Sequence, residues 1–141
     1  MPSEVRAGER GSAPVDFALT SILVVVVVLA LLQLALGLHV RNVLTDAAGE
    51  GARRAALVGG DETEARDRVL VLSDAVLRDG YVESVTVTRT RTDGVGLVEV
   101  DVTAPLPLLG LMGPAGTLTV TGHAVDEDWL RAAEAAVAEG R

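Results

Sequence analysis

The longest feature in the hydrophobic pattern is an uncharged stretch near the N-terminus, from Phe17 to Leu38. Among its 22 residues, the polar side chains are Thr20, Ser21 and Gln33. As a helix the stretch would span roughly 33 Å, which is enough to cross the apolar part of a bilayer. It is longer than the apolar core of a secretory signal peptide, about 7 to 15 residues. The pattern therefore predicts a membrane-spanning helix.

Helical periodicity continues beyond this stretch. Apolar and small residues recur at spacings of three and four, while polar and charged residues occupy the opposite face. We expect the first helix to run from about Val15 to Leu57 and to end at Gly59-Gly60. The outer third of this helix is amphipathic, and its apolar stripe consists of Val40, Val43, Leu44, Ala47, Ala48, Gly51 and Ala55.

A second helix is predicted directly after the two glycines. Asp61 has the position of an N-cap residue, and Glu64 follows three residues later as in a capping box. The helical pattern ends near Asp79 and Gly80. One apolar stripe would face the core, made of Ala65, Val69, Leu72 and Val76.

A β-hairpin is predicted around Asp93-Gly94, which lies between two runs of alternating apolar and polar residues. Pairing outward from this two-residue turn gives one dry face and one wet face. The expected pairs are Val87 with Val100 and Val85 with Val102 on the dry face, and Thr86 with Asp101 and Thr88 with Glu99 on the wet face.

The C-terminal sequence predicts one more strand and a short helix. The strand from Thr117 to Ala124 alternates in the same way and would add Leu118 and Val120 to the dry face. Residues 126–140 have the pattern of a helix with an acidic first turn. On one side of this helix lie Trp129, Leu130, Ala133 and Val137.

These elements together predict an α+β fold. A long N-terminal transmembrane helix would extend into a small domain with a second helix, a three-stranded antiparallel sheet and a short C-terminal helix. The 103 residues from His39 onward suffice for one small domain with a modest core. We expect the dry face of the sheet to be covered by the second helix and the outer part of the first.

The charge balance bears on possible partners. The chain has 20 acidic and 12 basic residues, and from His39 onward it has 17 acidic and 10 basic residues. Nucleic acid is not an expected partner, because its binding depends on a basic surface. The chain has no cysteine, which excludes disulfides and cysteine metal sites.

No residue pattern points to catalysis or to a cofactor. His39 and His123 are the only histidines, and they lie 84 positions apart. The acidic run Asp126 to Asp128 lacks the ligand spacing of a calcium loop and fits a helix N-terminus better. A nucleophile-elbow motif and a phosphate-binding glycine loop are both missing from the sequence. We therefore expect no enzyme, no catalytic, cofactor-binding or metal-binding residue and no cofactor.

One charge stands out at the start of the apolar stretch. Asp16 lies between Val15 and Phe17, in the segment "RGSAPVDFAL". This segment, an apolar helix and then "VRNVLTDAAGEGARRAAL" resemble the N-terminal region of TadE-like pilus assembly proteins, the pseudopilins of the tight-adherence (Flp) pilus. The resemblance extends from about Arg10 to Asp128 and is more specific in its first half.

The resemblance implies roles for four residues. Proteins of this kind carry a short leader that ends in glycine, then an acidic residue and an aromatic residue at the fifth and sixth mature positions. Gly11 would be the last leader residue and Ser12 the new N-terminus, which together form the processing site. Asp16 and Phe17 would form the assembly motif. The family more commonly has Glu where this chain has Asp16.

The resemblance also implies a location, partners and a function. The protein would be a single-pass protein of the cytoplasmic membrane with a cytoplasmic N-terminus, acting as a structural minor pseudopilin in assembling a Flp or type IV-like adhesion pilus or a related secretion filament. The implied partners are the lipid bilayer, other TadE- or TadF-like pseudopilins, a prepilin peptidase and the inner-membrane pilus assembly platform. The implied organisation is a leader at 1–11, a transmembrane helix with the pilin-like motif at 12–38, a juxtamembrane amphipathic helix at 39–60, a small α+β extracytoplasmic domain at 61–126 and a C-terminal helix or tail at 127–141.

Three alternatives stay open at this point. Asp16 could be a first-turn acid favoured by the helix dipole and placed among the lipid headgroups. The chain could be an uncleaved, membrane-tethered binding module outside the cytoplasm. The apolar residues from Leu106 to Met112 could form a partner-binding patch in place of a core cover, a possibility that burial of Leu109 and Met112 would remove.

Overall fold

The computed structural model describes residues 12–92, 95–106 and 116–139. They form an α+β protein whose first and longest element is helix α1, Ser12–Ala56. The chain divides into two compact units, Met1–Ala35 and Leu36–Arg141. The first unit contains the apolar part of α1, and the second contains the rest of α1 and all other elements. The functional boundaries expected from the sequence stay predictions.

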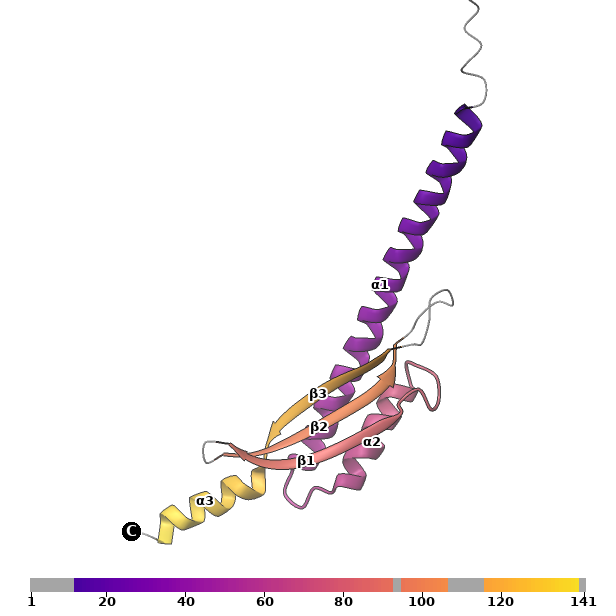
Figure 1. Ribbon diagram of the computed structural model, residues 1–141. Coiled ribbons are helices and arrows are strands. Elements are labelled where there is room, and N and C mark those ends of the chain that lie inside the picture. The colour runs from indigo at the N-terminus through magenta and orange to yellow at the C-terminus, as the bar shows by residue number, and fades with distance from the viewer. Residues whose placement is uncertain (1–11, 93–94, 107–115, 140–141) are drawn as a thin grey trace, which may run out of the picture. The chain divides into compact units, whose positions relative to one another are not determined.

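The second unit contains two further helices and one sheet (Figure 1). Helix α2, Glu62–Asp74, precedes the three strands, and helix α3, Glu127–Glu139, follows them. The strands are β1, Ser84–Thr92, β2, Val95–Pro105, and β3, Thr117–Val125. They form an antiparallel meander in the order β1-β2-β3, with β2 in the middle. The predicted fold class is therefore confirmed.

The register predicted from the hairpin pattern is also confirmed. Val87 pairs with Val100 and Val85 with Val102, while Thr86 faces Asp101 and Thr88 faces Glu99. Thr86, Thr88 and Thr90 of β1 are exposed, and every second residue of β2 from Gly96 to Ala104 is buried. The turn residues Asp93 and Gly94 lie outside the described residues.

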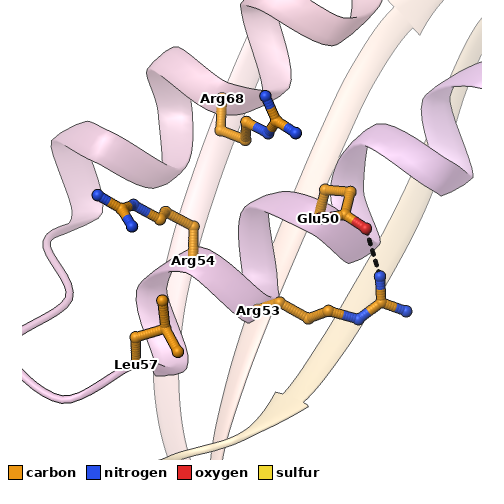
Figure 2. A pocket seen from close by; sticks show the side chains of 5 residues that line it. All are labelled: Glu50, Arg53, Arg54, Leu57 and Arg68. Atoms are coloured by element: carbon orange, nitrogen blue, oxygen red, sulfur yellow. Dashed lines mark hydrogen bonds and ion pairs between the residues drawn. The ribbon is translucent and has the colours of Figure 1, made fainter.

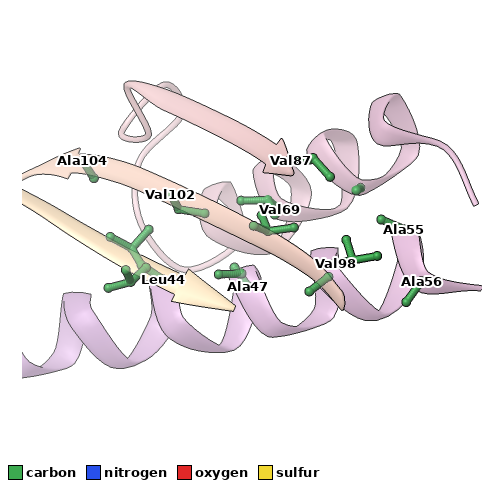
Figure 3. Close-up of a cluster of buried hydrophobic side chains, with 14 of the residues drawn as sticks. Leu44, Ala47, Ala55, Ala56, Val69, Val87, Val98, Val102 and Ala104 are labelled. Atoms are coloured by element: carbon green, nitrogen blue, oxygen red, sulfur yellow. The ribbon is translucent and has the colours of Figure 1, made fainter. Parts of the chain in front are cut away.

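The core lies between the dry face of the sheet and the two helices α1 and α2 (Figure 3). The predicted stripe of α1 is confirmed, since Leu44, Ala47, Ala48 and Ala55 are buried, and Ala52 and Ala56 join them. The strands contribute four buried residues that were predicted for the dry face, Val87, Val100, Val102 and Val120. Two further buried residues, Val98 and Ala104, were not among the predicted pairs. Among the residues that the structure describes, the buried hydrophobic residues are Val40, Leu44, Ala47, Ala48, Ala52, Ala55, Ala56, Ala65, Val69, Val87, Val98, Val100, Val102, Ala104 and Val120.

Helix α2 departs from its prediction at its C-terminal end. It ends at Asp74 rather than near Asp79, and the chain turns through Ala75 to Leu77, whose amides bond back to the carbonyls of Val71 and Ser73. As a consequence Val76 is 55% exposed and does not belong to the apolar stripe. Ser73 is buried in its place.

At the start of α2 the predicted N-cap is confirmed, but the predicted capping box is wrong. The Asp61 side chain caps the helix by accepting a hydrogen bond from the amide of Thr63 at 3.1 Å. Glu64 does not complete a capping box. Its carboxylate instead forms an ion pair with Arg54 of α1 at 2.9 Å, because the folded chain brings the two helix ends together.

The loop between β2 and β3 carries most of the apolar residues whose role the sequence left open. Leu106 is half-buried, and its amide donates a hydrogen bond to the carbonyl of Gly116 at 2.8 Å, which joins the two ends of the loop. Leu108, Leu109, Leu111 and Met112 lie outside the described residues, so both readings of this segment stay open.

The hydroxyl group of Tyr81 is partly buried near the open end of the hairpin, and its ionisation reports on the packing there. Its hydroxyl donates a hydrogen bond to the carbonyl of Pro105 at 2.7 Å. Burial raises the pKa of Tyr81 above its ordinary value of 10.0, and the nearby Arg78 guanidinium opposes part of this rise. The stability that the neutral phenol contributes is thus complete below pH 10 and is lost as the pH rises through the higher folded-state pKa.

We expect the phenolate absorbance of the folded protein to appear at a higher pH than that of the protein in denaturant. Tyr81 is the single tyrosine of the chain, so a spectrophotometric titration reports on this residue alone. The control Tyr81→Phe should show no phenolate signal. A folded-state midpoint at or below that of the denatured protein would contradict burial of the hydroxyl.

Candidate functional site

The apolar part of α1 is exposed on all sides. From Ile22 to Leu34 the large aliphatic side chains are 41% to 63% exposed, and no part of the most hydrophobic window is buried. A helix that is hydrophobic all round requires an apolar surrounding, and a lipid bilayer provides one. By length and composition this helix can cross a membrane, which fits a single-pass membrane protein.

The predicted processing and assembly motif lies at the start of α1. The helix begins at Ser12, the residue expected to become the N-terminus, whereas Gly11 lies outside the described residues. Pro14 fits the first turn, where an amide has no partner within the helix. Asp16 follows Ser12 by four residues and so lies on the same face one turn later. Phe17 is 76% exposed.

The outer part of α1 approaches the sheet closely at Gly122 of β3. Gly122 follows Leu118 and Val120 on the dry face and is itself buried. A Cβ atom at Gly122 would overlap the backbone carbonyl of Ala48 and lie 2.5 Å from the amide nitrogen of Gly49. The absence of a side chain thus allows the backbones of β3 and α1 to touch.

A second close approach joins α1 to α2. A Cβ atom at Gly51 would lie 2.5 Å from Cγ2 of Val69 and 3.2 Å from the carbonyl oxygen of Ala65. The sequence placed Gly51 in the apolar stripe but gave no sign that it meets Val69. Two glycines therefore fix how the outer part of α1 packs within its unit.

Arg89 of β1 forms a polar junction that the sequence analysis missed. Its guanidinium donates hydrogen bonds to the carbonyl oxygens of Ala55 and Gly60, each at 2.9 Å, and pairs with Asp126 at 3.1 Å. It thereby satisfies carbonyls at the C-terminal end of α1 and connects them to the start of α3. Strand alternation could have predicted this position, because Arg89 is two residues after Val87 and four after Val85 and so belongs to the dry face.

The acidic run Asp126 to Asp128 is a helix start, as the sequence interpretation favoured. One oxygen of Asp126 accepts hydrogen bonds from the amides of Asp128 and Trp129, and the other meets Arg89. Asp128 accepts a hydrogen bond from the amide of Gly59 at 3.3 Å. Within residues 12–92, 95–106 and 116–139, no three histidine or acidic side chains gather as a possible metal site.

Both histidines lie on the surface. His39 is exposed on α1, and His123 is exposed on the wet face of β3, with Nδ1 at 4.0 Å from the carboxylate of Glu99. An open hollow of about 400 Å³ borders α1 and β3 beside His123, with Asp46, Glu50 and Arg53 in its lining.

A second open hollow, of about 360 Å³, lies between α1 and α2 (Figure 2). We call it the arginine hollow, because Arg53, Arg54 and Arg68 line it together with Glu50 and Leu57. Arg53 pairs with Glu50, and Arg54 pairs with Glu64. Arg68 makes no hydrogen bond or ion pair with any other residue that the structure describes. Sequence analysis missed this hollow, because its arginines come from two helices.

Comparison with protein families finds a similarity in the N-terminal part of the chain. The family model described as TadE-like protein matches residues 11–53. This segment is TadE-like. It includes the predicted processing and assembly residues Gly11, Ser12, Asp16 and Phe17, all of the apolar stretch and the stripe of α1 as far as Ala52. The resemblance noted in the sequence is thus confirmed for the N-terminal segment.

The search of curated proteins and the search of solved structures gave no significant match. The TadE-like identification consequently rests on α1, and the sheet and the two later helices are understood from their own structure.

Proposed function

We propose that this protein is a structural minor pseudopilin that takes part in the assembly of a Flp-type adhesion pilus or a related secretion filament. The observation that supports the proposal is the match of residues 11–53 to the TadE-like family. Asp16 and Phe17 belong to this segment and lie in the first turns of a helix long enough to cross a membrane. The protein has no chemistry of its own in this proposal. It acts by inserting into the membrane and by binding other pilus assembly proteins.

The proposed orientation follows the TadE-like resemblance. Residues 1–11 face the cytoplasm and act as a leader, α1 crosses the cytoplasmic membrane, and the unit from Leu36 to Arg141 lies outside. A prepilin peptidase cleaves after Gly11 and leaves Ser12 as the N-terminus. The partners are other TadE- or TadF-like pseudopilins and the inner-membrane assembly platform.

Asp16 has a physical role in this proposal. A carboxylate at the border of the hydrocarbon is costly unless a positive group accompanies it. Cleavage after Gly11 would create an ammonium group at Ser12. The Asp16 carboxylate of one subunit would pair with the Ser12 ammonium of a neighbouring pseudopilin, which would fix the axial position of one helix relative to the next.

The leader can be tested by mass spectrometry of the protein purified from membranes of cells that contain the peptidase. We expect an N-terminus at Ser12. An intact Met1 would instead favour the uncleaved, membrane-tethered binding module.

The glycine requirement at the cleavage site gives a matched pair of variants. Gly11→Val should accumulate as a slower-migrating precursor, because a side chain at the last leader position obstructs close approach of the peptidase to the backbone. Gly8→Val, in the same leader, should mature at the wild-type rate. The measurement is the ratio of precursor to mature protein in pulse-labelled cells. Equal maturation of the two variants would refute cleavage after Gly11.

A further inference from the structure

Helix α3 has a side that is exposed among the residues that the structure describes. In its first turn Trp129 packs against Gly96 of β2 so closely that a Cβ atom at Gly96 would lie 2.8 Å from Cβ of Trp129. Farther along the helix, Leu130 is 42% exposed and Val137 is 69% exposed. On the predicted apolar side of α3, Trp129 and Ala133 are thus half-buried, whereas Leu130 and Val137 are open to solvent.

The exposed face of α3 combines apolar and acidic side chains. Glu127, Leu130, Glu134 and Val137 follow one another at spacings of three, four and three residues, which places them on one side of a helix. All four are exposed. The helix as a whole has four acidic residues and one basic residue, a net charge of −3. We call this side the acidic face of α3.

The arginine hollow has the complementary composition. Its lining contains three guanidinium groups and one carboxylate, and the Glu64 carboxylate pairs with Arg54. These five groups together carry a net charge of +1, in a protein whose net charge is −8. Leu57, 41% exposed, adds an apolar contact point among the arginines. Figure 2 shows Arg68 on α2, the residues Glu50, Arg53 and Arg54 on α1, and Leu57 directly after the end of α1. Arg68 is the cation of this group that lacks a partner among the described residues.

We propose that the acidic face of α3 in one copy of the protein docks into the arginine hollow of a second copy. Glu134 would pair with Arg68, and Leu130 would lie against Leu57. The match includes both charge and an apolar contact, whereas a small free anion would satisfy only the charge. The three arginines are exposed, so they do not form the desolvated cage that tight binding of a free anion requires.

This contact is small and depends on confinement. Helix α3 has 13 residues and is about 20 Å long, so one of its faces gives an interface at the weak end of the range for protein pairs. Copies that share a bilayer have a high effective concentration, which strengthens weak contacts. The hollow and the acidic face are different surfaces of one chain, so the contact is head-to-tail and can repeat along a row of copies.

Disulfide crosslinking tests the contact, and the chain has no cysteine of its own to interfere. Two differently tagged full-length proteins, one with Leu57→Cys and one with Leu130→Cys, are reconstituted in the same phosphatidylcholine vesicles and oxidised. We expect the mixed dimer in at least roughly fivefold excess over the control pair Thr86→Cys and Leu130→Cys, since Thr86 lies on the exposed face of β1. Equal yields from the two pairs would refute docking at the hollow.

A charge exchange between the two copies tests the ion pair itself. Arg68→Glu in the Leu57→Cys protein should lower the mixed-dimer yield by roughly fivefold, because it brings two carboxylates together. Adding Glu134→Arg to the Leu130→Cys protein should restore the yield. Failure of the exchange to restore it would refute the pairing of Arg68 with Glu134. None of these outcomes depends on leader cleavage or on Asp16, so the proposed function and this contact can fail separately.

Discussion

Gly122→Ala is expected to destabilise the second unit of the protein by about 3 kcal/mol or more. The added methyl group would overlap the backbone carbonyl of Ala48, and backbone atoms inside a helix cannot move aside as a flexible side chain can. A unit of about 100 residues has only some 5 to 15 kcal/mol of stability. The expected fall in Tm is thus roughly 4 to 8 °C for each kcal/mol lost.

The control for this experiment is Gly49→Ala on the other side of the same contact. A Cβ atom at Gly49 meets nothing within 4 Å, and alanine favours the helix by up to about 1 kcal/mol relative to glycine. Thermal unfolding of the full-length protein in detergent, followed by Trp129 fluorescence, should show a lower Tm for Gly122→Ala and an equal or higher one for Gly49→Ala. A Gly122→Ala protein as stable as wild type would mean that α1 and β3 do not touch here.

Asp16→Ala is expected to leave membrane insertion intact and to abolish most of the assembly. Removing a charge makes the apolar segment more hydrophobic, so the amount of protein in the membrane should not fall. Under the proposed function, the Ser12 ammonium of the neighbour would lose its partner in a poorly hydrated place. The loss of one member of a buried ion pair commonly costs about 3 to 5 kcal/mol.

Asp16→Glu is the matched control, because it keeps the charge and restores the residue that is commoner in the TadE-like family. It should assemble at least as well as wild type. The measurements are the amount of each variant in the membrane, its crosslinking to partner pseudopilins and the yield of pili. Wild-type crosslinking and pilus yield for Asp16→Ala would indicate that Asp16 is only a helix-start acid.

The sequence predicted those parts of the fold that depend on local periodicity. Strand alternation repeats every two residues, so the turn at Asp93-Gly94 was enough to align Val87 with Val100 and to assign the faces of the hairpin. The same reasoning identified Leu44 and Ala48 on α1, because a helical stripe can be read without knowing what covers it.

Other features depend on which elements meet, and local patterns do not contain that information. Glu64 has the spacing of a capping-box residue, yet its ion pair with Arg54 exists because α1 and α2 lie together. Val76 continues the helical stripe of α2 in sequence, but the chain leaves the helix before reaching it. The arginine hollow and the Gly122 contact likewise join residues that are distant in the sequence.

In the candidate site, too, some residues could be predicted from a local motif and others depend on contacts between distant parts of the chain. Ser12, Asp16 and Phe17 were found because a short motif carries their spacing, and the TadE-like match covers that motif. The roles of these residues in cleavage and assembly stay predictions. The position of Arg89 on the dry face could have been predicted from the sequence, because Arg89 alternates in step with Val85 and Val87. A charged side chain on that face needs polar partners, and the carbonyl groups at the end of a helix are such partners.

Helix α1 also determines how the protein can be divided for experiments. In the described part of the chain, seven of the fifteen buried hydrophobic residues, from Val40 to Ala56, belong to the helix that contains the apolar stretch. A water-soluble fragment that begins after Leu57 would lose nearly half of the core together with the membrane anchor. A fragment that begins near Leu36, at the boundary of the second unit, would keep the whole core. Limited proteolysis of the folded protein should accordingly yield a stable product that retains the residues from Val40 onward.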